Sequence, residues 1–109
     1  MIVTTGFEVP GYEVESVLGV VRGIVVRSPG IAQGLMGGLR QIFGGNIIEY
    51  VQVSEKARSD AYEIMIQHAM SLQADAIIGM RYDATEFAPS ITEVLAYGTA
   101  VRLTASEHT

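Results

Sequence analysis

The pattern of apolar and polar residues predicts two strands in the first quarter of the chain. A short β-branched run at 2–5 is followed by a Pro-Gly turn at 10–11 and by residues 12–27, which are rich in Val and Ile. Gly19 and Gly23 lie inside the second run, where glycine is typical of a bulge or a bend. We therefore expect a short strand, a turn and a long, irregular strand.

A first helix is expected from about Gly30 to Phe43. Ser28 is suited to the N-cap and Pro29 to the first helical position. The glycine pair at 44–45 is suited to end this helix, because glycine accepts a positive φ without a Cβ clash.

A second, longer helix is expected from about Ile47 to Ala74. Asn46 is a suitable N-cap, and Glu49 follows it at the spacing of a capping box. Apolar residues recur at helical spacing along one side of this segment: Ile47, Val51, Ala57, Ala61, Met65, Ala69 and Leu72. The pattern predicts an amphipathic helix.

The C-terminal third returns to strand patterns, from Ala76 to Phe87 and from Ile91 to Leu103, joined by a turn at 89–90. The element order is β-β-α-α-β-β, which predicts one α+β domain over residues 1–103 with an antiparallel-rich sheet and a long amphipathic helix. The polar residues 104–109 are expected to form a disordered tail.

Self-association is suggested by the apolar content of the chain. Hydrophobic residues make up 49% of it, more than a small globule usually hides. In the last strand, residues on both faces are mostly apolar or small: Leu95, Tyr97 and Val101 on one face, and Val94, Ala96, Gly98 and Ala100 on the other. The second helix would be about 40 Å long in a domain roughly 35 Å across. We expect a homo-oligomer in the form of a closed ring.

The glycines of the first helix favour close packing over phosphate binding. Gly34, Gly37 and Gly38 each cost about 1 kcal/mol relative to alanine in a helix, so close backbone contact is needed to offset them. Gly34 and Gly38 lie one turn apart and could pack against another subunit, as could Tyr97 and Gly98 of the last strand. A phosphate loop would need a following lysine, which the sequence lacks here.

Charge and cysteine content exclude several classes of function. The formal net charge of −5 disfavours nucleic acid and anionic membrane surfaces as partners. The chain has no cysteine, which excludes disulfides and thiolate metal sites. No apolar run reaches the roughly 18 residues of a membrane span, and the first residues do not resemble a signal peptide, so a cytoplasmic protein is expected.

Five ordered blocks resemble the YbjQ-like family of small bacterial and archaeal proteins: "MIVTT", "PGYEVESVLGVVRG", "GLRQIFGG", "ADAIIGMRYD" and "TEVLAYGTAV". The resemblance covers residues 1 to about 103. It implies an α+β subunit of the dodecin-like class, a pentameric ring and a family name that refers to heavy-metal binding. It does not imply a biochemical activity.

Metal binding has little support from the residue types. Imidazole comes only from His68 and His108, and no second His lies three or four positions from His68. A histidine with a structural hydrogen bond is therefore favoured at 68, and Met65 and Met70 are expected to pack. One route remains open, because a ring could bring copies of one ligand together at its axis.

Four charged residues are expected in apolar surroundings: Arg58, Arg81, Asp83 and Glu93. A buried guanidinium needs a carboxylate partner, so the favoured interpretation is a structural ion-pair network, within the chain or with a neighbouring subunit. The alternative is a pocket for a small anion, in which the two arginines are anchors and Tyr82 or Tyr97 is a wall.

No common catalytic motif is present, neither a nucleophile elbow nor a zinc-protease helix. We expect a cytoplasmic homo-oligomeric module without a catalytic site and without a cofactor. The alternative class is a metal- or small-anion-binding protein with sites at subunit boundaries or on the ring axis.

Overall fold

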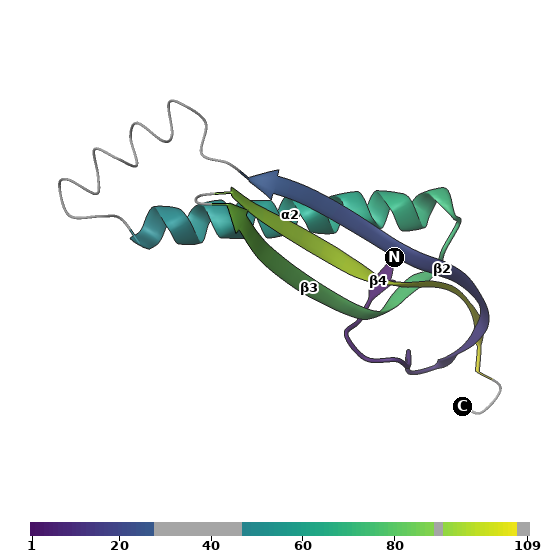
Figure 1. Cartoon of the computed structure of the whole chain (residues 1–109). Coiled ribbons are helices and arrows are strands. Elements are labelled where there is room, and N and C mark those ends of the chain that lie inside the picture. Colours follow the sequence, from purple (N-terminus) through teal and green to yellow (C-terminus); the bar gives the residue numbers. More distant parts are fainter. Residues whose placement is uncertain (28–46, 89–90, 107–109) are drawn as a thin grey trace, which may run out of the picture.

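The computed structural model describes residues 1–27, 47–88 and 91–106. Its elements are shown in Figure 1: β1 (Ile2–Val3), β2 (Tyr12–Arg27), α2 (Ile47–Ser71), β3 (Ala76–Ala88) and β4 (Ile91–Ala105). The predicted helix over 30–43, with Gly34 and Gly38, lies outside the described residues. The four predicted strands and the long helix are confirmed.

The strands form one mixed sheet in the order β1-β3-β4-β2. β3 and β4 form the predicted antiparallel hairpin, and β2 pairs antiparallel with β4, whereas β1 is parallel to β3. Helix α2 lies along one face of this sheet, mainly over β2 and β4, and its first turns extend beyond the strand ends in Figure 1. The described residues therefore form two layers, with β2 at one edge of their sheet.

The core lies between α2 and the inner face of the sheet, the face toward the helix. Small and medium side chains fill it: Ala57, Ala61, Met65 and Ala69 from α2, and Val21, Ile77, Val94, Ala96 and Ala100 from the strands. These helical positions are among those that the apolar spacing predicted. The alternate residues of β4 face the other way, as the strand period requires.

Gly19 and Gly23 have different roles in β2. Gly19 has a φ of 129° and lies at one of two register shifts, between Val14 and Ser16 and between Val17 and Gly19. The bulge predicted there is confirmed. Gly23 instead lies in regular register, where a Cβ would collide with the Ala61 carbonyl oxygen and lie 2.6 Å from the Met65 nitrogen. Its missing side chain lets α2 approach the sheet.

Four boundaries differ from the prediction, and the smallest difference is that β3 ends at Ala88 and not at Phe87. β1 ends at Val3, and Thr4 continues beside β3 through hydrogen bonds to Ile77 and Met80. Helix α2 ends at Ser71 because Gln73 adopts a left-handed φ of 60°. β4 continues to Ala105, two residues into the predicted tail, because Ala105 and its neighbour pair with the start of β2.

Candidate functional site

The four charged residues expected to cluster lie on two sides of the sheet. Arg58 is exposed on α2 and its Nη1 lies 3.2 Å from Glu55 Oε1 of the same helix. Arg81, Asp83 and Glu93 lie on the outer face, the face away from α2, because they alternate with the core residues of β3 and β4. The structure thus separates Arg58 from the other three residues.

The expected ion pairs among these residues do not form within the described part of the chain. Arg81 Nη1 donates to the carbonyl oxygens of Thr5 (2.7 Å) and Met80 (2.8 Å), and its guanidinium lies 5.9 Å from the centre of the Phe7 ring. Asp83 accepts a hydrogen bond from the Ala84 nitrogen. Backbone groups and the N-terminal segment therefore satisfy residues that were expected to pair with each other.

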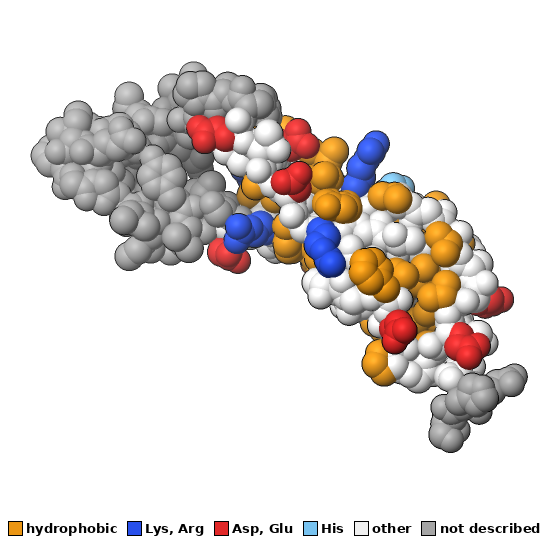
Figure 2. Space-filling view, turned by 60° about the horizontal axis from the view of Figure 1, so that its bottom comes forward, with side chains coloured by type: hydrophobic (Ala, Val, Ile, Leu, Met, Phe, Trp, Pro, Cys, Tyr) orange, Lys and Arg blue, Asp and Glu red, His pale blue; other side chains and the backbone are white. Residues whose placement is uncertain are grey.

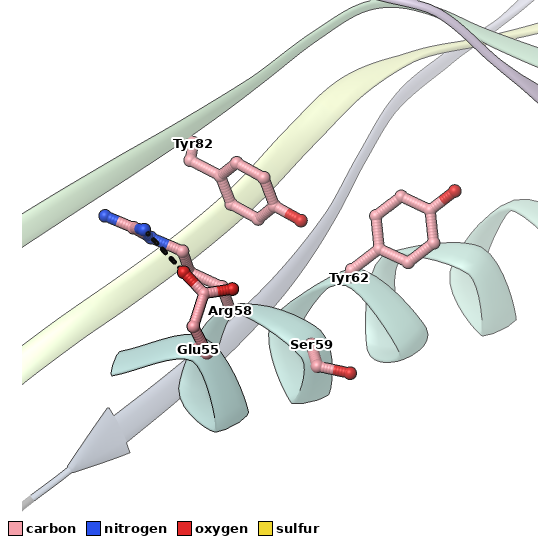
Figure 3. Close-up of a pocket in the computed structure, with 5 residues that line it drawn as sticks. All are labelled: Glu55, Arg58, Ser59, Tyr62 and Tyr82. Atoms are coloured by element: carbon pink, nitrogen blue, oxygen red, sulfur yellow. Dashed lines mark hydrogen bonds and ion pairs between the residues drawn. The ribbon is translucent and has the colours of Figure 1, made fainter. Parts of the chain in front are cut away.

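Two residues of the predicted anion site, Arg58 and Tyr82, line a shallow pocket between α2 and β3. Its volume is about 550 Å³, and Figure 3 shows its lining: Glu55, Arg58, Ser59, Tyr62 and Tyr82. Burial raises the pKa of Tyr82, Tyr62 and Glu55 raise it further, and Arg58 acts in the opposite direction. Because Arg58 already pairs with Glu55, the pocket offers an anion no unpaired cation among its lining residues.

The outer face has a row of exposed apolar side chains along the edge strand. These residues, here named the β2 stripe, are Val14, Val17, Val20, Ile24 and Val26. Val17 and Val20 have exposed fractions of 66% and 68%. Such exposure is unusual for valine, which is one of the residues most often buried in folded proteins. Figure 2 shows one face of the molecule, with hydrophobic side chains open to the surface between charged ones.

The two bulges explain why the β2 stripe is continuous. Val14, Val17 and Val20 are spaced by three residues, so a regular strand would place Val17 on the opposite face from the other two. Each register shift adds one residue, and all three valines pair with residues on the same face of β4: Leu103, Val101 and Thr99. The apolar face is therefore longer than alternation in the sequence predicts.

The N-terminal segment covers only one end of the outer face. Val9 packs there with Ala76 and Val101. The remainder, including half-buried Leu95 and Tyr97 of β4, has no covering element within residues 1–27, 47–88 and 91–106. This uncovered apolar face is the feature most characteristic of an interaction site.

Tyr97 and Gly98 occupy opposite faces of β4. Tyr97 lies on the outer face, opposite Arg22 of β2 and Arg81 of β3, where a role in subunit packing stays a prediction. Gly98 is buried, and a Cβ there would lie 2.5 Å from Ile77 Cγ2. Its small size is thus already explained by contacts within the chain.

His68 has the hydrogen bond expected of a structural histidine. It is half-buried, and its Nδ1 accepts the backbone N–H of Arg22 at 3.2 Å. Arg22 was not singled out from the sequence, although it is the one charged residue between Val14 and Val26 other than Glu15. Met65 is fully buried, as expected, whereas Met70 is 55% exposed.

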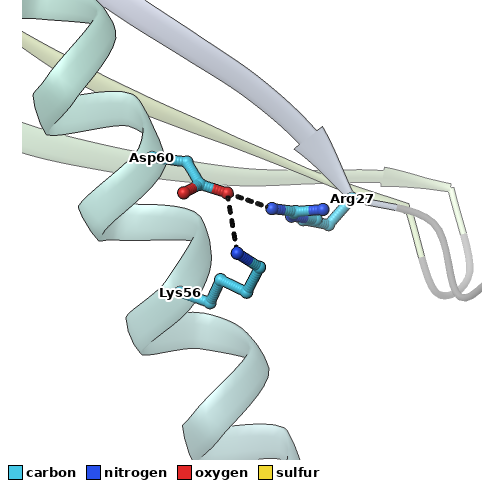
Figure 4. Close-up of polar contacts among 3 residues, drawn as sticks. All are labelled: Arg27, Lys56 and Asp60. Atoms are coloured by element: carbon cyan, nitrogen blue, oxygen red, sulfur yellow. Dashed lines mark hydrogen bonds and ion pairs between the residues drawn. The ribbon is translucent and has the colours of Figure 1, made fainter.

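A second polar contact joins the end of β2 to α2. Arg27 donates to Asp60, and Lys56 Nζ lies 3.8 Å from the same carboxylate oxygen, as Figure 4 shows. All three groups are partly exposed, so we expect each pair to contribute little to stability. The contact fixes the position of Arg27 and engages its guanidinium.

The chain matches a family model, YbjQ_1, described as "Putative heavy-metal-binding", over residues 1–104. The chain belongs to the YbjQ family. A UPF0145 protein of Chromobacterium violaceum is 59% identical to this YbjQ chain over 102 residues, which cover 94% of the chain and 87% of the relative. A UPF0145 protein of Legionella pneumophila strain Corby is 55% identical and covers 93% and 96%.

The YbjQ fold also resembles a solved structure. A protein with unknown function of the DUF74 family from Pediococcus pentosaceus superposes with a TM-score of 0.64 at 20% identity, over 95% of this chain and 98% of that one. At this identity the likeness concerns the fold alone. It supports the α+β arrangement of the family member described above.

The described residues of this YbjQ chain do not fit the heavy metal that the family description names. Within the described residues, no group of three or more His, Asp or Glu side chains could hold an ion, and the whole sequence has no cysteine. Heavy metals prefer sulfur ligands, which only methionine could supply here.

The described helix, α2, is not long and apolar enough to cross a membrane.

Proposed function

We propose that this protein is a cytoplasmic homo-oligomeric module, a ring of five copies, whose biochemical role depends on assembly and not on a catalytic site. The observation that carries this proposal is the uncovered apolar outer face, above all the β2 stripe. Exposed apolar area of this extent is typical of an interaction surface and is costly to leave in water.

The polarity of the two layers supports contact through the sheet. The outward side of α2 carries polar residues such as Lys56, Glu63 and Gln67, which suit a solvated surface. The outer face of the sheet carries the apolar β2 stripe, Leu95 and Tyr97 beside its few charged residues. We therefore expect neighbouring copies to contact each other through the outer face of the sheet, with α2 exposed to water. The number of copies rests on the YbjQ-like resemblance.

The proposal is tested by light scattering of the untagged protein at micromolar concentration. We expect a mass of five chains of 11.7 kDa for the wild type. The double variant Val20→Asp/Ile24→Asp places two charges in the β2 stripe, so we expect it to lose the assembly and approach the mass of one chain. Ile64→Asp, at a 47% exposed position on α2, is the control and should keep the mass.

A wild-type mass of one chain would contradict the proposal. The alternative, binding of a metal or small anion at subunit boundaries, is tested on the same preparation by elemental analysis. We expect no stoichiometric metal, since the described residues of one chain offer no ligand group. Retained metal that disappears together with the assembly would favour the alternative.

A further inference from the structure

We propose that Arg22 of one copy forms an ion pair with Glu93 of a neighbouring copy, and that this pair sets the register of the contact through the outer face. The proposal rests on the proposed function, because it requires a second copy on that face. It adds the specific charges by which one copy recognises the next.

Arg22 is held at its backbone and free at its side chain. The His68 ring accepts its N–H, and the register with Tyr97 places its side chain on the outer face between Val20 and Ile24. The side chain is exposed, and no hydrogen bond or ion pair engages it among the described residues. A fixed backbone with an unpaired guanidinium is well suited to binding an acid on another molecule.

Glu93 presents the opposite charge at the other end of the same face. It is half-buried on β4, between Val26 of β2 and Thr85 of β3, and has no cationic partner within the described residues. The nearby cations are engaged elsewhere, because Arg27 binds Asp60 and Arg81 binds backbone carbonyl groups. A half-buried, unpaired carboxylate becomes costly once a partner removes its remaining water.

Arg22 and Glu93 of one chain are too far apart to pair with each other. Arg22 lies opposite Tyr97, and Glu93 lies opposite Val26, four positions along the strands. At about 3.3 Å per residue, these positions are roughly 13 Å apart. Ile24 and Leu95 lie between them as an apolar row. The two charges therefore mark separate ends of an apolar contact.

Opposite charges at two ends of an apolar face select one register. The apolar row supplies contact area but little direction, because it would accept a shifted neighbour almost as well. A shifted copy would leave Arg22 and Glu93 desolvated and unpaired, which strongly disfavours that arrangement. When Arg22 of one copy meets Glu93 of the next, unlike parts of the two copies come into contact, which is compatible with the head-to-tail contact of a closed ring.

The test is a charge exchange, measured as the dissociation constant of the assembly by light scattering over a dilution series. We expect Arg22→Glu and Glu93→Arg each to weaken association at least tenfold. The double variant Arg22→Glu/Glu93→Arg should restore it. Arg58→Glu and Glu63→Arg, which make the same changes on α2, are the matched controls and should leave association unchanged. Circular dichroism and thermal unfolding confirm the fold of each variant.

Mixing the two single variants separates contacts between copies from contacts within one chain. We expect the mixture of Arg22→Glu and Glu93→Arg subunits to recover association partly, since each unlike neighbour restores an opposite-charge pair. The proposal is overturned if association recovers in the double variant but not in the mixture. It is also overturned if the single variants associate as tightly as the controls. If those variants assemble while Val20→Asp/Ile24→Asp does not, the pair fails but the proposed function stands. A monomeric wild type overturns both.

Discussion

At the scale of the residue, Gly23 determines how close the helix lies to the sheet. It faces Ala61 and Met65 of α2 at a point where backbone meets backbone, and the alanines at 57 and 69 continue the same close contact. Backbone atoms cannot move aside as the end of a flexible side chain can. The position therefore requires glycine for packing, although its φ is not in the left-handed region.

We predict that Gly23→Ala lowers the free energy of unfolding by about 3 kcal/mol, because the added methyl group forces α2 away from β2. Urea unfolding followed by circular dichroism measures the change. Gly6→Ala is the matched control, since a Cβ there meets only Thr4 Oγ1 at 3.6 Å. If the two variants have similar free energies of unfolding, α2 can move away from β2 without a loss of stability, and the prediction is wrong.

At the scale of the element, β2 depends on its two bulges. They place Val14, Val17 and Val20 on one face despite their spacing of three residues, and they leave Glu15 as the residue inserted at the first register shift. The strand β2 therefore has a long apolar face although its apolar residues do not alternate regularly in the sequence. A bulge in this strand therefore serves the surface that the strand presents.

We predict that deleting Glu15 keeps the apolar face of β2. Without the inserted residue, Val14 and Ser16 become consecutive and can still lie opposite Leu103 and Arg102, so regular alternation leaves Val14 on the outer face. Both the deletion and Glu15→Ala should stay close to the stability of the wild type, within about 0.5 kcal/mol for the substitution, as for other exposed sites. Chemical unfolding of both variants checks this, and a much lower stability of the deletion variant would show that the bulge itself is required.

The sequence predicted the elements better than the site. The strands, the hairpin and the buried face of α2 follow from residue type and spacing, which act locally. The expected ion pairs within one chain are absent from the described residues, because Arg58 lies on the other side of the sheet from the other three charges and Arg81 binds backbone carbonyl groups. Pairing with a neighbouring subunit stays a prediction. The β2 stripe was missed because the bulges alter the period of two, and only Gly19 indicated one of them.

At the scale of the whole molecule, the described residues form a four-stranded sheet with α2 on one face, and none of them covers most of the other face. Such a subunit resembles half of a layered structure whose remaining layer comes from outside. If neighbouring copies provide that layer, the stability of the fold is linked to the concentration of the protein. This linkage distinguishes an assembly from a stable single subunit.

We predict that the unfolding temperature rises by several degrees between 1 and 100 μM protein, an order of magnitude that follows from mass action and the small size of the chain. Differential scanning calorimetry or fluorimetry with an added dye measures it, since the chain has no tryptophan. Val20→Asp/Ile24→Asp should show a lower unfolding temperature without this dependence. A constant wild-type value would argue against coupled folding and assembly.

The hydrogen bond from Arg22 to His68 has a consequence for unwanted growth. An edge strand exposes a row of donors and acceptors to which other strands can add without limit, a common route to fibrils. Because the imidazole engages one of these donors near the middle of β2, an incoming strand would meet an interrupted ladder. Helix α2 thus helps to keep a chain rich in valine and isoleucine from forming cross-β aggregates.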